Sequence, residues 1–267
     1  MAVSKSRAKK PTYILEEEGD FSRPRTNKKS EYKLRATDIF SLDDIKKCPI
    51  ILTPEQEDAI KIIDNNEISI IEGNPGCTKT FTSIMAALIA LSTNKCERIY
   101  ITKPLQVSGD EEIGILPGGV QDKSKFFMES YMDIFESILD KNIVSQLIGG
   151  GFIQELLISY ARGRTISKNS YLLLDEAQSV TMKGLYLIST RTNSSSRLII
   201  IGDSAQSDLP DSKNKFNDFV NMIKDLPDVG RYKFDISHNK RSKLVMQITE
   251  KYEEYINSNN TKKLLKG

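Results

Sequence analysis

The chain has 267 residues, of which 39% are hydrophobic and 28% are charged, and its formal net charge is +2. Such a composition belongs to globular proteins and excludes fibrous and largely disordered chains. The longest apolar run, residues 84–91, is far shorter than the roughly 18 residues that cross a bilayer, and no apolar stretch marks a secretory signal, so we expect a cytoplasmic protein without a membrane partner.

Residues 1–48 are predicted to form a basic, partly flexible N-terminal arm. Residues 1–40 contain ten lysines and arginines against six aspartates and glutamates, so positive charge is concentrated there. The segments SKSRAKK and SRPRTNKKSEYKLR have the composition of sequences that bind phosphate backbones. A solvated, disordered leader has the same composition, so the sequence leaves both interpretations open.

From residue 52 onward, short apolar runs alternate with helical patterns, which predicts one α/β domain over residues 49–257 and a polar tail at 258–267. Strands are expected at residues 68–72, 98–102, 171–175, 197–202 and 232–237. Helices are expected at residues 54–63, 80–91, 125–138, 183–189, 214–223 and 243–256. Because the strands are continuously apolar, we expect a mainly parallel sheet with helices on both faces. The loop at 103–123 is too long for a plain turn and is predicted to be functional or mobile.

A phosphate-loop motif lies between the first expected strand and the helix that follows it. Residues 70–83 read IIEGNPGCTKTFTS and match G-x-x-x-x-G-K-[ST] except at Thr78, where the pattern has glycine. Glycines let such a loop turn its N–H groups toward phosphates, and the following helix N-terminus adds further donors. We expect Lys79 at the β- and γ-phosphates of ATP and the Thr80 hydroxyl on Mg²⁺. The expected nucleotide-binding residues of the loop are Gly73, Asn74, Pro75, Gly76, Cys77, Thr78, Lys79 and Thr80.

Two residues of this loop leave alternatives open. If residue 78 needs a positive φ, Thr78 costs on the order of 1–3 kcal/mol, which weakens nucleotide binding roughly ten- to a hundredfold. If it does not, the Thr78 hydroxyl can donate a hydrogen bond and little is lost. Cys77 is either a small loop residue or a thiol whose pKa is lowered by Lys79 and the helix N-terminus.

Polar residues also follow two later strands. In YLLLDEAQ, Asp175 is expected to hold Mg²⁺ through water, and Glu176 to orient and deprotonate the attacking water. In IIIGDSAQSDLP, Gln206 stands where its amide can sense the γ-phosphate or that water. Because the carboxyl ends of parallel strands meet at one edge, we expect a single ligand site there. Gln56 suits a glutamine that reads adenine, but a helix-capping segment explains LTPEQ equally well.

Six short motifs follow one another along the chain: GNPGCTKT, TKP…SGDEEIGILPGG, ARGRT, LLLDEAQ, STR and GDSAQSDLP. Their order and rough spacing are those of PhoH-family ATPases, which the chain resembles over about residues 52–256. The resemblance implies a RecA-like P-loop NTPase domain related to superfamily 1 helicase cores, with ATP and Mg²⁺ as cofactors. It also implies roles for Arg162 and Arg164, of which we expect Arg164 to be catalytic together with Lys79, Glu176 and Gln206. Arg191 and Arg241 stand near later basic positions of the family. The chain departs from the family at Thr78, and at Lys103, where arginine is usual.

Two functions are compatible with these motifs. The first is ATP hydrolysis coupled to binding or unwinding of nucleic acid, with single-stranded RNA favoured. The second is an ATP-dependent oligomeric switch or adaptor without motor activity; the family's association with phosphate starvation comes with the resemblance and with no particular residue. Residues 49–257 have room for one RecA-like domain, so we expect an arginine from a neighbouring subunit and hence a homo-oligomer, most simply a ring. The absence of a nuclease-like segment favours a compact, virus-encoded form of the family.

Overall fold

A computed structural model of the chain describes residues 34–104, 120–156, 158, 166–192, 194–203 and 215–235, together with residues 244, 247, 248, 251 and 255. All of them belong to one unit of the chain, which begins at Leu34.

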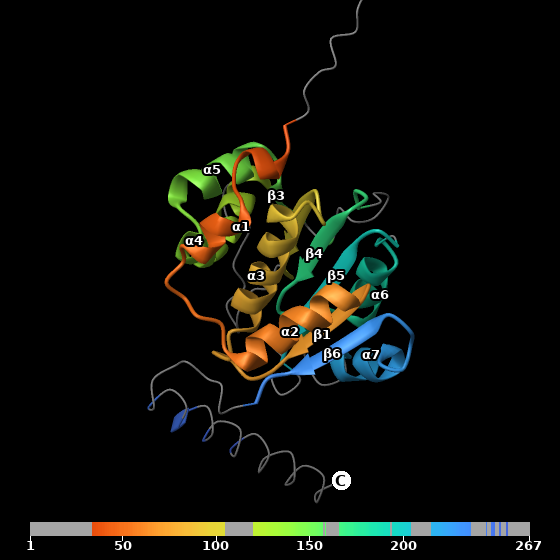
Figure 1. The fold of residues 1–267 in the computed structure, drawn as a ribbon. Coiled ribbons are helices and arrows are strands. Elements are labelled where there is room, and N and C mark those ends of the chain that lie inside the picture. The colour runs from red at the N-terminus through yellow and green to blue at the C-terminus, as the bar shows by residue number, and fades with distance from the viewer. Residues whose placement is uncertain are drawn as a thin grey trace, which may run out of the picture. The chain divides into compact units, whose positions relative to one another are not determined.

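The described residues form a six-stranded sheet in the order β3-β2-β4-β5-β1-β6 (Figure 1). Every neighbouring pair of strands is parallel. The strands are β1 (Ile68–Glu72), β2 (Arg98–Thr102), β3 (Ile153–Glu155), β4 (Ser170–Leu174), β5 (Arg197–Gly202) and β6 (Val229–Lys233). β5 therefore lies between β1, which leads into the phosphate loop, and β4, which leads into Asp175. The predicted α/β fold, RecA-like with a parallel sheet, is confirmed.

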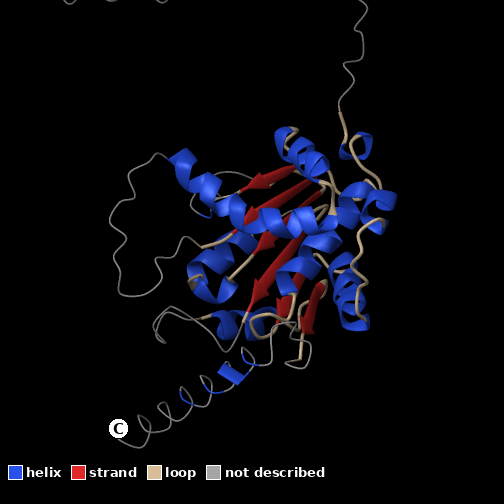
Figure 2. Cartoon of the chain, turned by 90° about the vertical axis from the view of Figure 1, so that its left-hand side faces the viewer, coloured by secondary structure: helices blue, strands red, loops and turns tan. Residues whose placement is uncertain are grey.

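Helices cover both faces of the sheet (Figure 2). One face carries η1 (Ala36–Asp38), α1 (Leu42–Lys46), α2 (Pro54–Asn65), α3 (Lys79–Ser92), α4 (Val120–Ile138) and α5 (Lys141–Gly149). The other carries η3 (Ala177–Ser179), α6 (Met182–Ser189) and α7 (Phe216–Ile223). Successive residues of a strand point to opposite faces, so Ile71 packs with the first set and Ile70 with the second. Both residues are fully buried, as continuously apolar strands predict.

The helix that precedes the phosphate-loop strand begins at a capping box. The Thr53 hydroxyl accepts from the backbone N–H of Gln56 at 3.4 Å, and the Gln56 side chain accepts from the backbone N–H of Thr53 at 2.9 Å. Pro54 occupies the first helical position, where no N–H is needed. This start fixes Gln56 on the inner side of the first turn of α2, where it is buried.

The packed region begins earlier than expected. Residues 36–46, which we assigned to the N-terminal arm, form η1 and α1, and Ala36, Phe40 and Ile45 belong to the core beside α3. Their apolar side chains are few and stand among charged residues, so composition alone assigned them to the arm. The remainder of the arm lies outside the described residues.

The last strand is also displaced from its expected position. β6 covers Val229–Lys233 rather than residues 232–237, and its first residue pairs with Ile68 at the start of β1. Gly230 and two charged residues made this segment look like a loop. Among the described strands, β6 pairs only with β1, so exposed charged side chains are tolerated at this edge of the sheet. The helix expected at 243–256 and the tail lie almost entirely outside the described residues.

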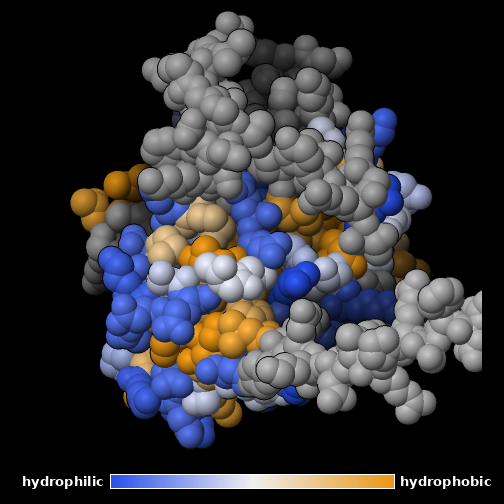
Figure 3. Space-filling view, turned by 90° about the horizontal axis from the view of Figure 1, so that it is seen from above, coloured by the Kyte–Doolittle hydropathy of each residue, from blue (hydrophilic) through white to orange (hydrophobic). Residues whose placement is uncertain are grey.

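Within the described part of the chain, no helix is both long and apolar enough to span a membrane. On the face shown in Figure 3, hydrophilic residues lie around and between the hydrophobic patches.

Candidate nucleotide-binding and catalytic site

The phosphate loop runs from the end of β1 to the first turn of α3. Gly73 and Gly76 have φ angles of +152° and +87°, which favour glycine. A Cβ atom at Gly73 would lie 2.9 Å from the Cβ of Phe234, so this glycine is also required for close packing. The loop therefore folds back over the N-terminus of α3, as a phosphate-binding loop must.

Thr78 has a left-handed backbone, with φ 59° and ψ 21°, and is the N-cap of α3. Of the two alternatives for this position, the one that requires a positive φ is thus the one observed. Two sets of hydrogen bonds hold the residue. Its hydroxyl accepts from Nε2 of Gln56 at 2.9 Å, and its carbonyl oxygen accepts from the backbone N–H and the hydroxyl of Thr82 at 2.9 and 2.8 Å.

Lys79 is the first residue of α3, and its side chain folds back onto the loop. Its ammonium group donates to the carbonyl oxygens of Gly73 at 2.6 Å and Asn74 at 3.0 Å. The cationic group expected at the β- and γ-phosphates is therefore held beside the first two residues of the loop.

Cys77 is fully buried within the loop. Burial raises the pKa of its thiol, and the nearby charge of Lys79 lowers it by less. The interpretation as a reactive thiol with a lowered pKa is therefore wrong, and Cys77 is a small, inert loop residue. Cys48, Cys77 and Cys96 are all free thiols.

Thr80 and Asp175 meet across the site. The Thr80 hydroxyl lies 3.3 and 3.2 Å from the two carboxylate oxygens of Asp175, which directly follows β4. Burial raises the pKa of Asp175, and the neighbouring charge of Glu176 raises it further. A hydroxyl and a buried carboxylate are hard oxygen ligands, so these two residues fit Mg²⁺. Among the described residues no group of three or more His, Cys, Asp or Glu could hold a metal alone, so phosphate oxygens and water would complete the coordination.

Tyr131 is a site residue that sequence reasoning missed. It lies on α4, is 3% exposed, and its hydroxyl donates to Oδ2 of Asp175 at 3.1 Å. Burial and the charge of Asp175 raise the pKa of this tyrosine. Within the expected helix, Tyr131 has the spacing of an ordinary core aromatic, so no local signal distinguishes it.

Glu176 also has a left-handed backbone, with φ 53° and ψ 42°. Strained residues of this kind concentrate at functional sites. Its side chain is exposed, and Oε2 accepts from Nε2 of Gln178 at 2.5 Å. The buried Gln178 also accepts, through Oε1, from the backbone N–H of Asp203 at 3.0 Å. Gln178 therefore links the expected catalytic carboxylate to the end of β5, which no sequence pattern indicated.

The expected meeting of strand ends is thus observed. The ends of β1, β4 and β5 bring the phosphate loop, Asp175 and Asp203 to one edge of the sheet, as doubly covered parallel sheets do at their ligand sites. The end of β2 contributes as well, since the carbonyl oxygen of Thr102 accepts from the backbone N–H of Asp175 at 2.9 Å. The charge of the adjacent Lys103 lowers the pKa of Asp175.

The remaining predicted residues are distributed as follows. Four of them lie outside the described residues, namely Gln206, Arg162, Arg164 and Arg241. Arg191 directly follows the C-cap of α6, on the face opposite α3, where its carbonyl accepts from the backbone N–H of Ile166 at 3.4 Å. Gln56 is 4% exposed and belongs to the capping box of α2, which was the second interpretation of that segment.

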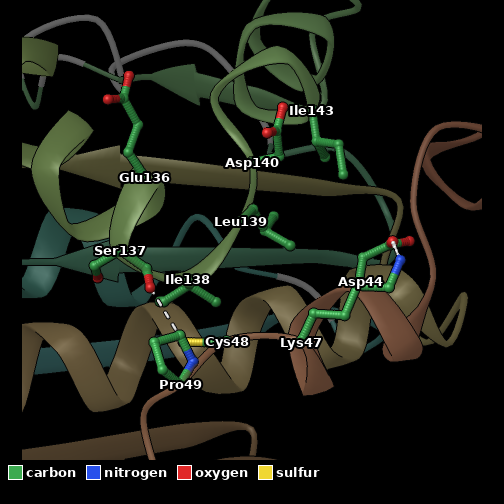
Figure 4. A pocket seen from close by; sticks show the side chains of 10 residues that line it. All are labelled: Asp44, Lys47, Cys48, Pro49, Glu136, Ser137, Ile138, Leu139, Asp140 and Ile143. Carbon is green, nitrogen blue, oxygen red and sulfur yellow. Dashed lines mark hydrogen bonds and ion pairs between the residues drawn. The ribbon is translucent and has the colours of Figure 1, made fainter.

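Apart from this site, a cavity of about 510 Å³ lies between α1 and the junction of α4 and α5 (Figure 4). Its rim carries Asp44 and Lys47, which pair at 2.8 Å, together with Glu136 and Asp140. The Cys48 thiol donates to the carbonyl oxygen of Ser137 at 3.1 Å. No residue of the phosphate loop lines this cavity, nor do the carboxylates that follow β4.

Comparison with known proteins agrees with this geometry. The family described as PhoH-like protein matches residues 50–253. A PhoH-like protein of Synechocystis sp. is 31% identical over 207 residues, which cover 77% of this chain and 62% of that protein. A PhoH-like protein of Bacillus subtilis is 28% identical over 205 residues, covering 76% and 64%. The chain thus spans less than two thirds of the length of these relatives.

Among solved structures, the large terminase from a thermophilic bacteriophage is 10% identical with a TM-score of 0.46, over 76% of this chain and 50% of that one. The family assignment rests instead on the match across residues 50–253 and on the phosphate loop, parallel sheet and converging strand ends described above. On these grounds the chain belongs to the PhoH family and has its nucleotide-binding P-loop fold.

Proposed function

We propose that the chain is a magnesium-dependent ATPase that couples ATP hydrolysis to the binding or unwinding of nucleic acid, with single-stranded RNA as the favoured partner. The observation that carries this proposal is the contact of 3.2 Å between Thr80 Oγ1 and Asp175 Oδ2. It joins the phosphate loop to the carboxyl end of β4, so that one cation can contact both residues and a nucleotide phosphate.

The loop and Lys79 would bind the phosphates. The backbone N–H groups at the N-terminus of α3 are donors that helices leave free, and their partial positive charge favours an anion. The ammonium group of Lys79 now bonds two neutral carbonyl oxygens. Exchanging these neutral acceptors for anionic phosphate oxygens pairs opposite charges, which gives stronger hydrogen bonds. Mg²⁺ would neutralise charge on the β- and γ-phosphate oxygens.

Glu176 would activate the attacking water. Its exposed carboxylate is oriented through Oε2 by Gln178, and Oε1 can accept the proton of a water that attacks the γ-phosphorus. Asp175 is buried and bonded to the Thr80 hydroxyl, so it serves the metal rather than the water. Adjacent carboxylates in different surroundings thus take different roles.

The proposed partners follow from the charge of the N-terminal residues and from the architecture of the sheet. The excess of basic residues in positions 1–40 supports nucleic-acid binding. The described residues form one RecA-like unit, and in a homo-oligomer a neighbouring subunit would supply an arginine to its γ-phosphate. Cytoplasmic localisation stays part of the same proposal.

The test is steady-state ATP hydrolysis by the purified chain with and without single-stranded RNA. Glu176→Gln is the catalytic variant. Glu67→Gln is the matched control, because Glu67 is exposed and directly precedes β1. It therefore lies at the amino-terminal end of that strand, whereas the site lies at the carboxyl ends. We expect hydrolysis that RNA stimulates, that is lost in Glu176→Gln and that is unchanged in Glu67→Gln.

The strained backbone of Thr78 within the loop favours the second candidate, a nucleotide-dependent switch. If the chain binds ATP but hydrolyses it no faster than Glu176→Gln does, the motor proposal fails and the switch takes its place. If the oligomeric state then changes on ATP binding, as size-exclusion chromatography with light scattering would show, the switch is supported.

A further inference from the structure

Gln56 is held between two parts of the protein and is shielded from solvent. Its Oε1 accepts from the backbone N–H of Thr53 at 2.9 Å, and its Nε2 donates to the hydroxyl of Thr78, 22 residues further along the chain, at 2.9 Å. Only 4% of the residue is exposed. Both polar atoms of the side-chain amide thus form hydrogen bonds inside the protein.

Thr78 is the residue that needs this support. Its φ of 59° lies in the left-handed region, where a β-branched residue is an outlier and where the phosphate-loop pattern has glycine. Strained backbones persist when their surroundings over-determine them. Here the surroundings are the hydrogen bond from Gln56 at the hydroxyl and two bonds from Thr82 at the carbonyl oxygen.

We propose that Gln56 is a positioning residue of the phosphate loop, which acts by holding Thr78 in the conformation that glycine would adopt freely. The proposal rests on the proposed function only in that the loop binds phosphates. A glycine in this place needs no partner, whereas a threonine brings a hydroxyl through which α2 can fix the loop. Gln56 and Thr78 together replace the missing glycine.

Ligand specificity distinguishes the two possible roles of Gln56. A glutamine that reads adenine would favour ATP over GTP and would contribute nothing to the binding of a ligand without a base. A glutamine that holds Thr78 contributes equally to every ligand that the phosphate loop holds. Because Gln56 is buried and bonded at both ends, the structure favours the second behaviour.

The experiment measures dissociation constants by calorimetry for ATP, GTP and inorganic tripolyphosphate, each with Mg²⁺. The variants are Gln56→Ala, Thr78→Val, which keeps the branched shape without the hydroxyl, and the double variant. We expect each single variant to weaken the binding of all three ligands by the same factor, about fivefold for one neutral hydrogen bond. The double variant should lose no more than either single variant, because both remove the same bond.

Thr53→Ala is the matched control, because it removes the side-chain cap of α2 and leaves the bond from Gln56 to Thr78 in place. Its affinities should equal those of the parent chain, and equal losses in Thr53→Ala and Gln56→Ala would overturn the proposal. A loss in Gln56→Ala confined to ATP would also overturn the inference, while the proposed function as an ATP-binding protein would stand. If the parent chain binds none of the three ligands, the proposed function and this inference fail together. Should Gln56→Ala not fold, Thr78→Val decides alone, since unchanged affinities in that variant would refute the inference.

Discussion

Replacing Tyr131 with phenylalanine tests whether α4 takes part in the metal site. The change removes one hydroxyl and keeps the ring in the core. That hydroxyl lies 3.1 Å from Oδ2 of Asp175, and the two residues are 3% and 7% exposed. Water therefore has little access to replace the lost donor. A hydrogen bond to a charged group contributes about 1.5–3 kcal/mol, and this bond favours the ionised form of Asp175.

The sign of the effect follows from what surrounds Asp175. Burial and the charge of Glu176 raise the pKa of Asp175, whereas the backbone N–H of Glu176, the hydroxyl of Tyr131 and the charge of Lys103 lower it. Removing the hydroxyl therefore raises this pKa further. The carboxylate that we propose binds Mg²⁺ is then protonated at a higher pH, so the acid limb of the pH profile should move upward by about one pH unit or more.

The assay is the pH dependence of Mg²⁺-dependent ATP hydrolysis, with a Mg²⁺ titration at each pH. Tyr171→Phe serves as the control, because Tyr171 is a buried tyrosine near the start of β4, at the far end of the strand from Asp175. We expect the shift in Tyr131→Phe and none in Tyr171→Phe. If Tyr131→Phe has the parent profile and the parent Mg²⁺ affinity, the hydroxyl does not tune Asp175 and the reasoning is refuted.

Two further predictions concern the loop and the catalytic carboxylate. Gly73→Ala should lower the free energy of unfolding by about 1–3 kcal/mol and abolish ATP binding, because its φ is +152° and its Cβ would meet Phe234 at 2.9 Å. Gly149→Ala, at a helical glycine with open space around it, should leave ATP binding intact in the same calorimetric titration. Gln178→Ala should reduce kcat about tenfold or more and change the dissociation constant of ATP little, because it frees the carboxylate of Glu176 without touching the phosphate loop. A variant that loses ATP affinity and keeps kcat would contradict this role of Gln178.

The parts of the site that follow from local patterns could be predicted. The glycines of the phosphate loop lie between an apolar strand and a helix that begins with Lys79 and Thr80, and Asp175 follows another apolar strand. Because parallel strands end at one edge, their meeting required no knowledge of the sheet order. The same logic predicted the two-faced helical cover from the continuity of the strands.

The side-chain contacts across the site could not be predicted. The bonds from Tyr131 to Asp175 and from Gln56 to Thr78 join residues 44 and 22 positions apart, on helices whose rotation is set by packing. Gln178 follows Glu176 closely, yet its bond to Asp203 depends on β5 being the neighbour of β4, and the order of strands cannot be read from local patterns. The start of β6 was missed for a similar reason, since pairing with β1 rather than apolar character fixes that edge strand.

The sheet order also determines when the nucleotide site can form as the chain folds. β1 pairs with β5 on one side and with β6 on the other, and both partners follow it by well over a hundred residues. During synthesis from the N-terminus, the strand that leads into the phosphate loop therefore stays without either neighbour until residue 202 has been made. Its second edge stays open until residue 233. Such long-range parallel pairing folds slowly, and open strand edges invite association with other chains. Assembly of this nucleotide site is thus a late event in folding, and a chain that ends before Val229 would expose the edge of β1 that pairs with β6.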